Sequence, residues 1–141
     1  MNRYIKIFTF SYVILVVLLA GLAEILKMKS GTPFAVASVL GATFFASAAF
    51  GKDHARAPTR EEKAAFAWRA LLSVWLLSLV FSVVFMAILV PASEVRSMLR
   101  MFTSGSTLVW IGGLFLFLSV IHYLAIRWSF GWYAKRAAGG A

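Results

Sequence analysis

The sequence predicts an all-α integral membrane protein, a four-helix bundle that forms a single transmembrane domain over residues 1–141. Three observations lead to this prediction. Hydrophobic residues make up 62% of the chain, whereas about half of the residues are apolar in water-soluble domains. They fall into four runs, each close to the length that crosses a ~30 Å hydrocarbon core. One dense polar segment, residues 51–63, divides the runs into two pairs, so we expect a short cytoplasmic hairpin between the second and third helices.

The first span is expected over residues 7–26. Basic residues flank this apolar run of about twenty residues, which at ~1.5 Å per residue matches the hydrocarbon core. A cleaved signal peptide is the alternative, because small residues at 21–23 form a candidate cleavage site. The apolar run continues to Leu26, which favours a retained helix.

The second span, residues 34–50, is the shortest and is rich in small residues. Ser38, Ala42 and Ala46 recur every four residues, a pattern that lets a neighbouring helix backbone approach closely. We therefore expect a packing helix, with a pore-lining strip as the alternative.

The third span, residues 68–90, belongs to a longer helix that begins at Thr59 or Arg60. Thr59 and Glu62 have the spacing of a capping box, in which each side chain binds the backbone N–H of the other residue. Pro91 is expected to end the helix.

This third helix is about 15 Å longer than the hydrocarbon core requires, so its first turns should lie in the headgroup region and the cytosol. Phe66, Trp68 and Arg69 fit that interface as aromatic anchors beside a cation.

The fourth span is expected over residues 108–126 and is followed by an aromatic and basic belt at 127–136, which is typical of a membrane surface. Between the third and fourth spans, residues 94–102 have apolar side chains along one side, which predicts a short interfacial helix. Gly105 is expected to break that helix.

The distribution of cations predicts the orientation. Of fourteen Lys and Arg residues, ten lie near the two termini and the central hairpin. The other four are in the first and third loops: Lys27, Lys29, Arg96 and Arg100. Cytoplasmic loops carry the excess of positive charge, so both termini and the hairpin are expected in the cytoplasm.

Three polar residues are candidates for a role inside the membrane: Glu24, Ser119 and His122. Glu24 is interpreted as an interfacial carboxylate neutralised by Lys27, with ion coupling as the alternative. His122 is expected to donate one hydrogen bond inside the bundle. Haem is disfavoured, because the other histidine, His54, lies in the hairpin rather than at a comparable depth. Serines of the third span are expected to form interhelical hydrogen bonds.

Four hairpin residues form a candidate contact surface: Lys52, Asp53, His54 and Arg56. Asp53 is expected to form a local turn after Gly51. Arg56 has no evident partner in the sequence and is expected to bind a lipid phosphate or a carboxylate of a partner protein. A metal site made by the acidic residues and His54 is the disfavoured alternative.

The types of residue in the spans do not favour an enzyme. The chain has no cysteine, and the spans contain neither a catalytic triad nor a carboxylate pair. We therefore expect no cofactor and no metal. The net charge of +9 comes from groups that flank apolar runs, as in membrane proteins, which disfavours nucleic acid as a partner.

Two segments carry a family resemblance: GKDHARAPTREE at 51–62 and FGWYAKR at 130–136. Together with the long apolar helix after the first segment, they resemble an uncharacterised family of small bacterial four-helix inner-membrane proteins. The resemblance implies a bacterial inner-membrane location and brings no catalytic residues.

The leading hypothesis is a non-enzymatic membrane protein that acts through protein or lipid contacts, either as an accessory subunit or as an immunity-type protein. Its expected partners are the lipid bilayer and either a membrane protein or a second copy of the chain in a homo-dimer. The alternative is a small dimeric transporter or channel for ions or small cations, lined by Glu24, His122 and the serines.

Overall fold

The computed structural model describes residues 1–27, 32–102 and 105–139, and all regular structure in these ranges is helical. Four helices are long and apolar enough to cross a membrane by length and composition, as predicted, and a short one joins the last two. The elements are α1 (Asn2–Ile25), α2 (Thr32–His54), α3 (Arg60–Leu89), α4 (Ala92–Phe102) and α5 (Gly105–Gly139).

The helices extend beyond the predicted spans at their polar ends. α1 begins at Asn2, α2 continues to His54, and α5 includes the whole aromatic and basic belt at 127–136. Hydropathy shows only which part of a helix is apolar, and polar residues continue a helix equally well. The short helix predicted over residues 94–102 is α4, which ends at Phe102, before Gly105, and Gly105 is the first residue of α5.

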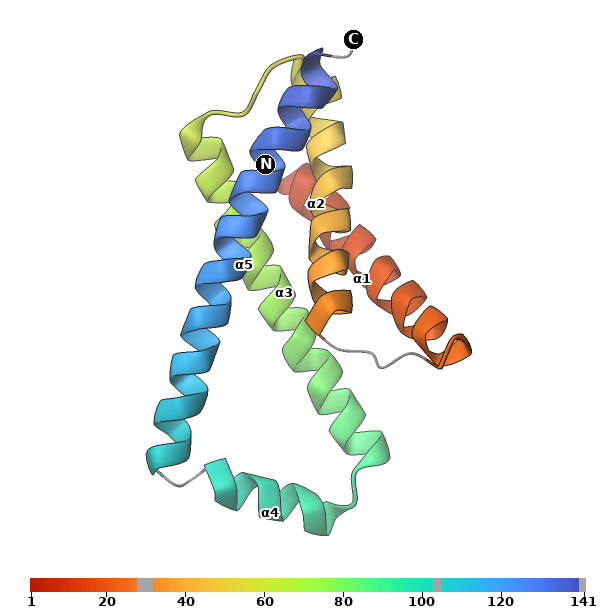
Figure 1. The fold of residues 1–141 in the computed structure, drawn as a ribbon, viewed down its shortest axis with the longest axis vertical. Helices are drawn as coiled ribbons and strands as arrows, with labels where there is room; N and C mark the ends of the chain where they lie inside the picture. The colour runs from red at the N-terminus through yellow and green to blue at the C-terminus, as the bar shows by residue number, and fades with distance from the viewer. Residues whose placement is uncertain (28–31, 103–104, 140–141) are drawn as a thin grey trace.

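The helices meet at one end of the molecule, which we call the closed end (residues 1–12, 38–54, 59–74 and 126–137). Here α2 packs against α1 and α5, and α3 packs against α5 (Figure 1). α2 is the most enclosed of the four long helices. This end positions the polar residues of the hairpin against the start of α1.

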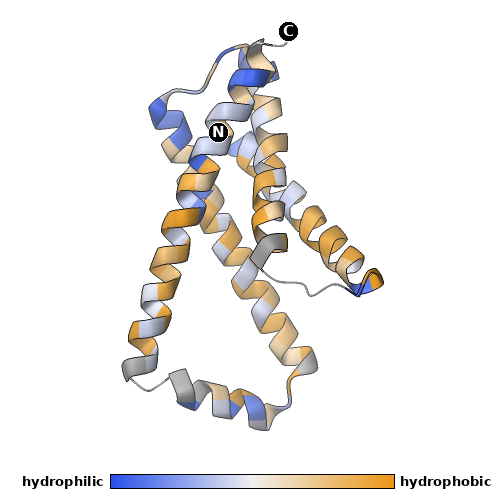
Figure 2. Cartoon of the chain, in the orientation of Figure 1, coloured by the Kyte–Doolittle hydropathy of each residue, from blue (hydrophilic) through white to orange (hydrophobic). Residues whose placement is uncertain are grey.

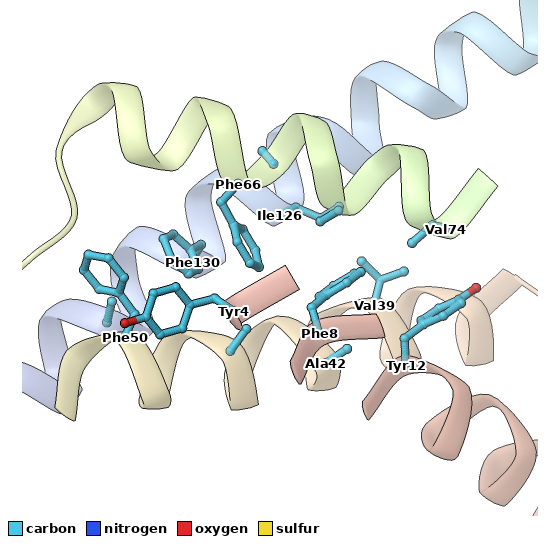
Figure 3. Packing of buried hydrophobic residues seen from close by; sticks show 14 residues of the cluster. Tyr4, Phe8, Tyr12, Val39, Ala42, Phe50, Phe66, Val74, Ile126 and Phe130 are labelled. Atoms are coloured by element: carbon cyan, nitrogen blue, oxygen red, sulfur yellow. The ribbon is translucent and has the colours of Figure 1, made fainter. Parts of the chain in front are cut away.

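Aromatic rings from all four long helices form the core of the closed end (Figure 3). Phe66 of α3 stacks on Phe130 of α5 with ring centroids 4.0 Å apart, and Phe8 of α1 meets Phe66 edge to face at 5.8 Å. Phe50 of α2 contacts Phe130 at 5.5 Å. Such ring pairs contribute about 0.5–1.5 kcal/mol beyond the area they bury. Phe66 was predicted at the membrane interface, but it is fully buried here.

Small residues let α2 approach its neighbours closely. Ser38, Ala42 and Ala46 are buried, which confirms the packing strip predicted from their four-residue spacing. At Gly51, a Cβ would lie 2.6 Å from Cβ of Ala137 and 2.9 Å from the backbone oxygen of Ala134. α2 and α5 therefore touch at Gly51 with no room for a side chain.

The opposite half of the molecule is open. Below Trp75 and Phe115, α3 and α5 diverge toward α4, which lies across the base (Figure 1). We call this region, residues 76–89 and 105–114 with α4, the wedge. Its α3 and α5 segments are strongly apolar, whereas α4 is mixed (Figure 2), and most large side chains of these two segments are exposed: Leu76, Leu79, Val80, Phe81, Val83, Val84, Phe85, Ile88, Leu108, Val109, Trp110, Ile111 and Leu114.

Candidate functional site

A polar cluster of Arg3, Tyr4, Asp53 and His54 joins the start of α1 to the end of α2. Arg3 Nη1 donates to Asp53 Oδ2 at 2.9 Å, and the Tyr4 hydroxyl donates to the same oxygen at 2.9 Å. Nε2 of His54 lies 3.2 Å from the Tyr4 hydroxyl oxygen. The cluster therefore ties together two helix ends that are about fifty residues apart in the chain.

Asp53 was predicted to form a local turn, and this prediction is wrong. Asp53 lies in the last turn of α2, and its carboxylate binds α1. The chain leaves the helix only at Ala55, whose φ of 48° is left-handed. A left-handed residue is a common helix ending, although alanine adopts it less readily than glycine. The sequence offered no signal for this, because the partners of Asp53 are distant in the chain.

The start of α3 contains the predicted capping box. Thr59 Oγ1 accepts a hydrogen bond from the Glu62 N–H at 3.2 Å, and Glu62 Oε2 accepts one from the Thr59 N–H at 2.8 Å. Together these bonds satisfy two backbone N–H groups at the start of the helix.

Arg56 closes the hairpin by binding the same carboxylate. Its Nη1 and Nη2 donate to Glu62 Oε2 and Oε1, both at 2.8 Å. This bidentate hydrogen bonding from Arg56, together with the Thr59 N–H, lowers the pKa of Glu62 to about 2. The sequence offered no evident partner for Arg56, which was expected to bind a lipid phosphate or a carboxylate of a partner protein, but Glu62 of the same hairpin binds it. Six residues separate the pair across the turn at Pro58, a spacing that helix periodicity does not reveal.

The candidate contact surface is thus mostly engaged within the chain. Asp53 and His54 belong to the polar cluster, and Arg56 binds Glu62 and lies over the Phe50 ring at 5.6 Å from its centroid. Lys52 is exposed at the end of α2. Asp53, His54 and Arg56 therefore have a structural explanation, because they join parts of the closed end to one another.

The candidate intramembrane residues lie in separate contacts. Glu24 is exposed near the end of α1, away from the core. His122 Nδ1 donates to the Leu118 carbonyl oxygen at 2.8 Å, and the His122 ring borders a small cavity of about 30 Å³ against α2. The Ser119 hydroxyl donates to the Phe115 carbonyl oxygen at 2.7 Å.

Ser73 was expected to bond to another helix, but its hydroxyl donates to the Arg69 carbonyl oxygen of its own helix at 3.0 Å. Serine commonly bonds the carbonyl one turn earlier in a helix. The guanidinium of Arg69, expected beside an aromatic anchor, donates to Asn2 Oδ1 at 3.0 Å.

A site at the apex of the wedge was not predicted from the sequence. Trp75 of α3 and Phe115 of α5 lie 4.0 Å apart by ring centroids and line a cavity of about 480 Å³, together with Ser78 and Ser82. Trp75 Nε1 is buried and has no hydrogen-bond acceptor among the described residues. A tryptophan in mid-helix followed by serines at one-turn spacing was the available signal.

Over the described ranges, no group of three His, Cys, Asp or Glu side chains is placed to hold a metal ion. Comparisons of the chain with protein-family models, curated proteins and solved structures find no match.

Proposed function

We propose that this chain is a non-enzymatic, multi-pass protein of the bacterial inner membrane that holds one transmembrane helix of a partner membrane protein in its wedge. The partner would be a complex to which the chain is an accessory subunit, or a pore-forming protein that it blocks as an immunity-type protein. One observation carries the proposal: an apolar wedge with a buried, unsatisfied indole N–H at its apex.

Composition and charge support the membrane location. Four helices have the length and hydropathy of membrane spans. The ends of the long helices that gather at the closed end come from the parts of the chain where ten of fourteen cations lie. By the positive-inside rule, we place the closed end, both termini and the hairpin in the cytoplasm.

The unsatisfied indole supports a proteinaceous occupant of the wedge. A buried donor without an acceptor costs about 1–3 kcal/mol, and a lipid tail has no oxygen with which to relieve that cost. Protein atoms cover Trp75 Nε1, so a partner helix with a hydroxyl, amide or free carbonyl oxygen at the apex would accept from it once the indole turns toward the cavity. Ser78 and Ser82 line the same cavity and offer further hydroxyls to such a helix.

The size of the base of the wedge supports the same occupant. α4 has eleven residues and lies across the base (Figure 1), so at ~1.5 Å per residue it extends for about 16 Å. Packed helices have axes about 8–10 Å apart, and two helices that flank a third are separated by about twice that distance. The base thus has about the width that a single inserted helix requires.

Site-specific photo-crosslinking in native membranes tests this function. A photoreactive phenylalanine analogue at Leu79, which lines the cavity, should form a discrete adduct whose labelled peptide maps to a transmembrane helix of another protein. The matched control is Leu22 of α1, which is also apolar and exposed but lies outside the wedge. Trp75→Phe retains a ring and removes the donor, so it should reduce the Leu79 adduct without changing labelling at Leu22.

Three results would overturn the proposal. Leu79 could give only lipid adducts, or only adducts with a second copy of the chain. Alternatively, the purified protein in liposomes could move ions or small cations, with loss of that flux in Glu24→Gln. This last result would establish the transporter hypothesis instead.

A further inference from the structure

A cationic groove lies between the start of α3 and the last third of α5, outside both the polar cluster and the wedge. It encloses about 440 Å³. Its lining combines cations, tryptophans and one apolar side chain: Lys63, Leu124, Arg127, Trp128, Gly131 and Trp132.

Two cations of the groove have no anionic partner among the residues that the structure describes. Over the described residues, neither Lys63 nor Arg127 forms an ion pair. Glu62, the neighbour of Lys63, is bound by both Nη atoms of Arg56. The groove therefore has a net positive charge that an external anion would neutralise.

The absence of a side chain at Gly131 lets Lys63 of α3 lie against the face of α5 that carries Arg127. A Cβ at Gly131 would lie 2.8 Å from Cδ of Lys63 and 3.4 Å from its Nζ. The Lys63 side chain of α3 thus lies directly against the α5 backbone at this point. Arg127 precedes Gly131 by four residues, so it projects from the same face of α5 about one turn away.

The groove is lined by the three kinds of side chain that suit the acyl chain, glycerol region and phosphate of a phospholipid: apolar, tryptophan and basic. Leu124 is the lining residue closest along α5 to its apolar half, Trp128 and Trp132 stack with centroids 6.0 Å apart, and the cations lie beside them. Tryptophan favours the glycerol and headgroup level of a bilayer, and basic side chains favour its phosphates. Arg136, whose Cζ lies 3.9 Å from the Trp132 ring centroid, adds a further positive charge near the mouth of the groove.

We propose that this groove is a binding site for an anionic phospholipid. Lys63 and Arg127 bind its phosphate, the tryptophans contact its glycerol region, and Leu124 contacts the first part of an acyl chain. The proposal rests on the membrane location given above and is independent of any partner helix in the wedge.

Native mass spectrometry of the detergent-solubilised full chain, titrated with phosphatidylglycerol, phosphatidylcholine or soluble glycerol 3-phosphate, tests this site. We expect phosphatidylglycerol to bind in preference to the other two. Neutralising both cations in Lys63→Gln/Arg127→Gln should weaken its binding about thirty-fold, as expected for two surface cations that each contact an anionic lipid. Lys52→Gln/Arg60→Gln removes the same charge from exposed positions outside the lining and should leave binding within about two-fold.

Two further variants separate binding from folding. Gly131→Ala keeps every charge but displaces the Lys63 side chain, so phosphatidylglycerol binding should fall several-fold. Gly113→Ala, whose new Cβ would meet open space, should not change it. The conservative pair Lys63→Arg/Arg127→Lys should retain most of the binding.

Equal loss in the two charge-neutralised double variants would overturn the proposal, because general charge would then account for the binding. It would also be overturned if phosphatidylcholine bound as well as phosphatidylglycerol, or if glycerol 3-phosphate competed at equal concentration. If Leu79 gave no crosslink to another protein while the preference for phosphatidylglycerol was retained, only the proposal of a partner helix in the wedge would be contradicted.

Discussion

The closed end and the wedge both carry large apolar side chains, but these side chains have opposite environments in the folded chain. Phe66 in the closed end is fully buried between Phe8 and Phe130, whereas Phe85, nineteen residues later in the same helix, is 59% exposed. Hydropathy alone does not distinguish these two phenylalanines. What differs is the neighbouring sequence: the closed end combines small residues on α2 with polar pairs that fix the helix ends.

The two regions should therefore have different roles: the closed end stabilises the folded chain, and the wedge binds a partner. Truncations in the closed end remove contacts that the chain makes with itself, so they should change the free energy of unfolding. Truncations in the wedge remove surface that the chain does not use alone, so they should affect only what the wedge binds. The following predictions test that separation.

The largest effect is expected for Phe66→Ala. It removes a ring that joins α1, α3 and α5 and leaves a cavity, so the free energy of unfolding should fall by about 3–5 kcal/mol. The matched control Phe85→Ala, in the same helix, should change it by less than about 1 kcal/mol. Denaturation in mixed detergent micelles measures both, and equal losses would show that the wedge is packed as tightly as the closed end.

A steric effect of intermediate size is expected for Gly51→Ala. The new methyl group would overlap Ala137 and the backbone oxygen of Ala134, so α2 and α5 must separate, at a cost of about 1–3 kcal/mol. Gly113→Ala in the open part of α5 should be neutral or stabilise the helix by up to about 1 kcal/mol. Comparable melting temperatures for the two variants would contradict the close contact at Gly51.

A smaller effect depends on pH. The pKa of Glu62 is lowered from 4.5 to about 2 in the folded chain. Its contribution to stability should therefore be fully present above about pH 4.5 and should be lost as the pH falls toward about 2. Glu62→Gln should flatten the stability profile in this window, whereas Glu61→Gln, at an exposed neighbouring position, should retain the wild-type slope.

The smallest effect is expected for Tyr4→Phe, which removes one hydroxyl from the polar cluster. The loss of its hydrogen bond to Asp53 should cost about 0.5–1 kcal/mol. Tyr133→Phe is the control, because the Tyr133 hydroxyl has no hydrogen bond among the described residues while its ring packs on Phe44. A larger loss in Tyr133→Phe than in Tyr4→Phe would contradict a fastening role for the cluster.

Local signals in the sequence were sufficient to predict the helices of the fold. The apolar runs identified the long helices, the spacing of Thr59 and Glu62 identified the start of α3, and the small residues of α2 identified its packing role. Each of these features depends on residues within one continuous segment of the chain.

Contacts between distant segments could not be predicted in the same way. Asp53 binds Arg3 across fifty residues, and Trp75 meets Phe115 across forty, with no periodicity to connect either pair. The wedge could not be predicted from the sequence either, because a hydropathy profile does not show whether an apolar helix face packs against another helix. The hairpin, predicted as a contact surface, instead holds helix ends together through contacts within the chain. The exposed apolar surface lies at the other end of the molecule.

Double electron–electron resonance in nanodiscs tests this account most directly, since the cysteine-free chain accepts spin labels at chosen sites. One pair joins the exposed residues Ala65 and Trp128 at the closed end, and the other joins Val84 and Val109 across the wedge. We expect a short, narrow distribution for the first pair and a mean distance about 8–10 Å longer for the second, the width of one helix. Equal distances for both pairs would describe a parallel bundle without a wedge and would contradict the account.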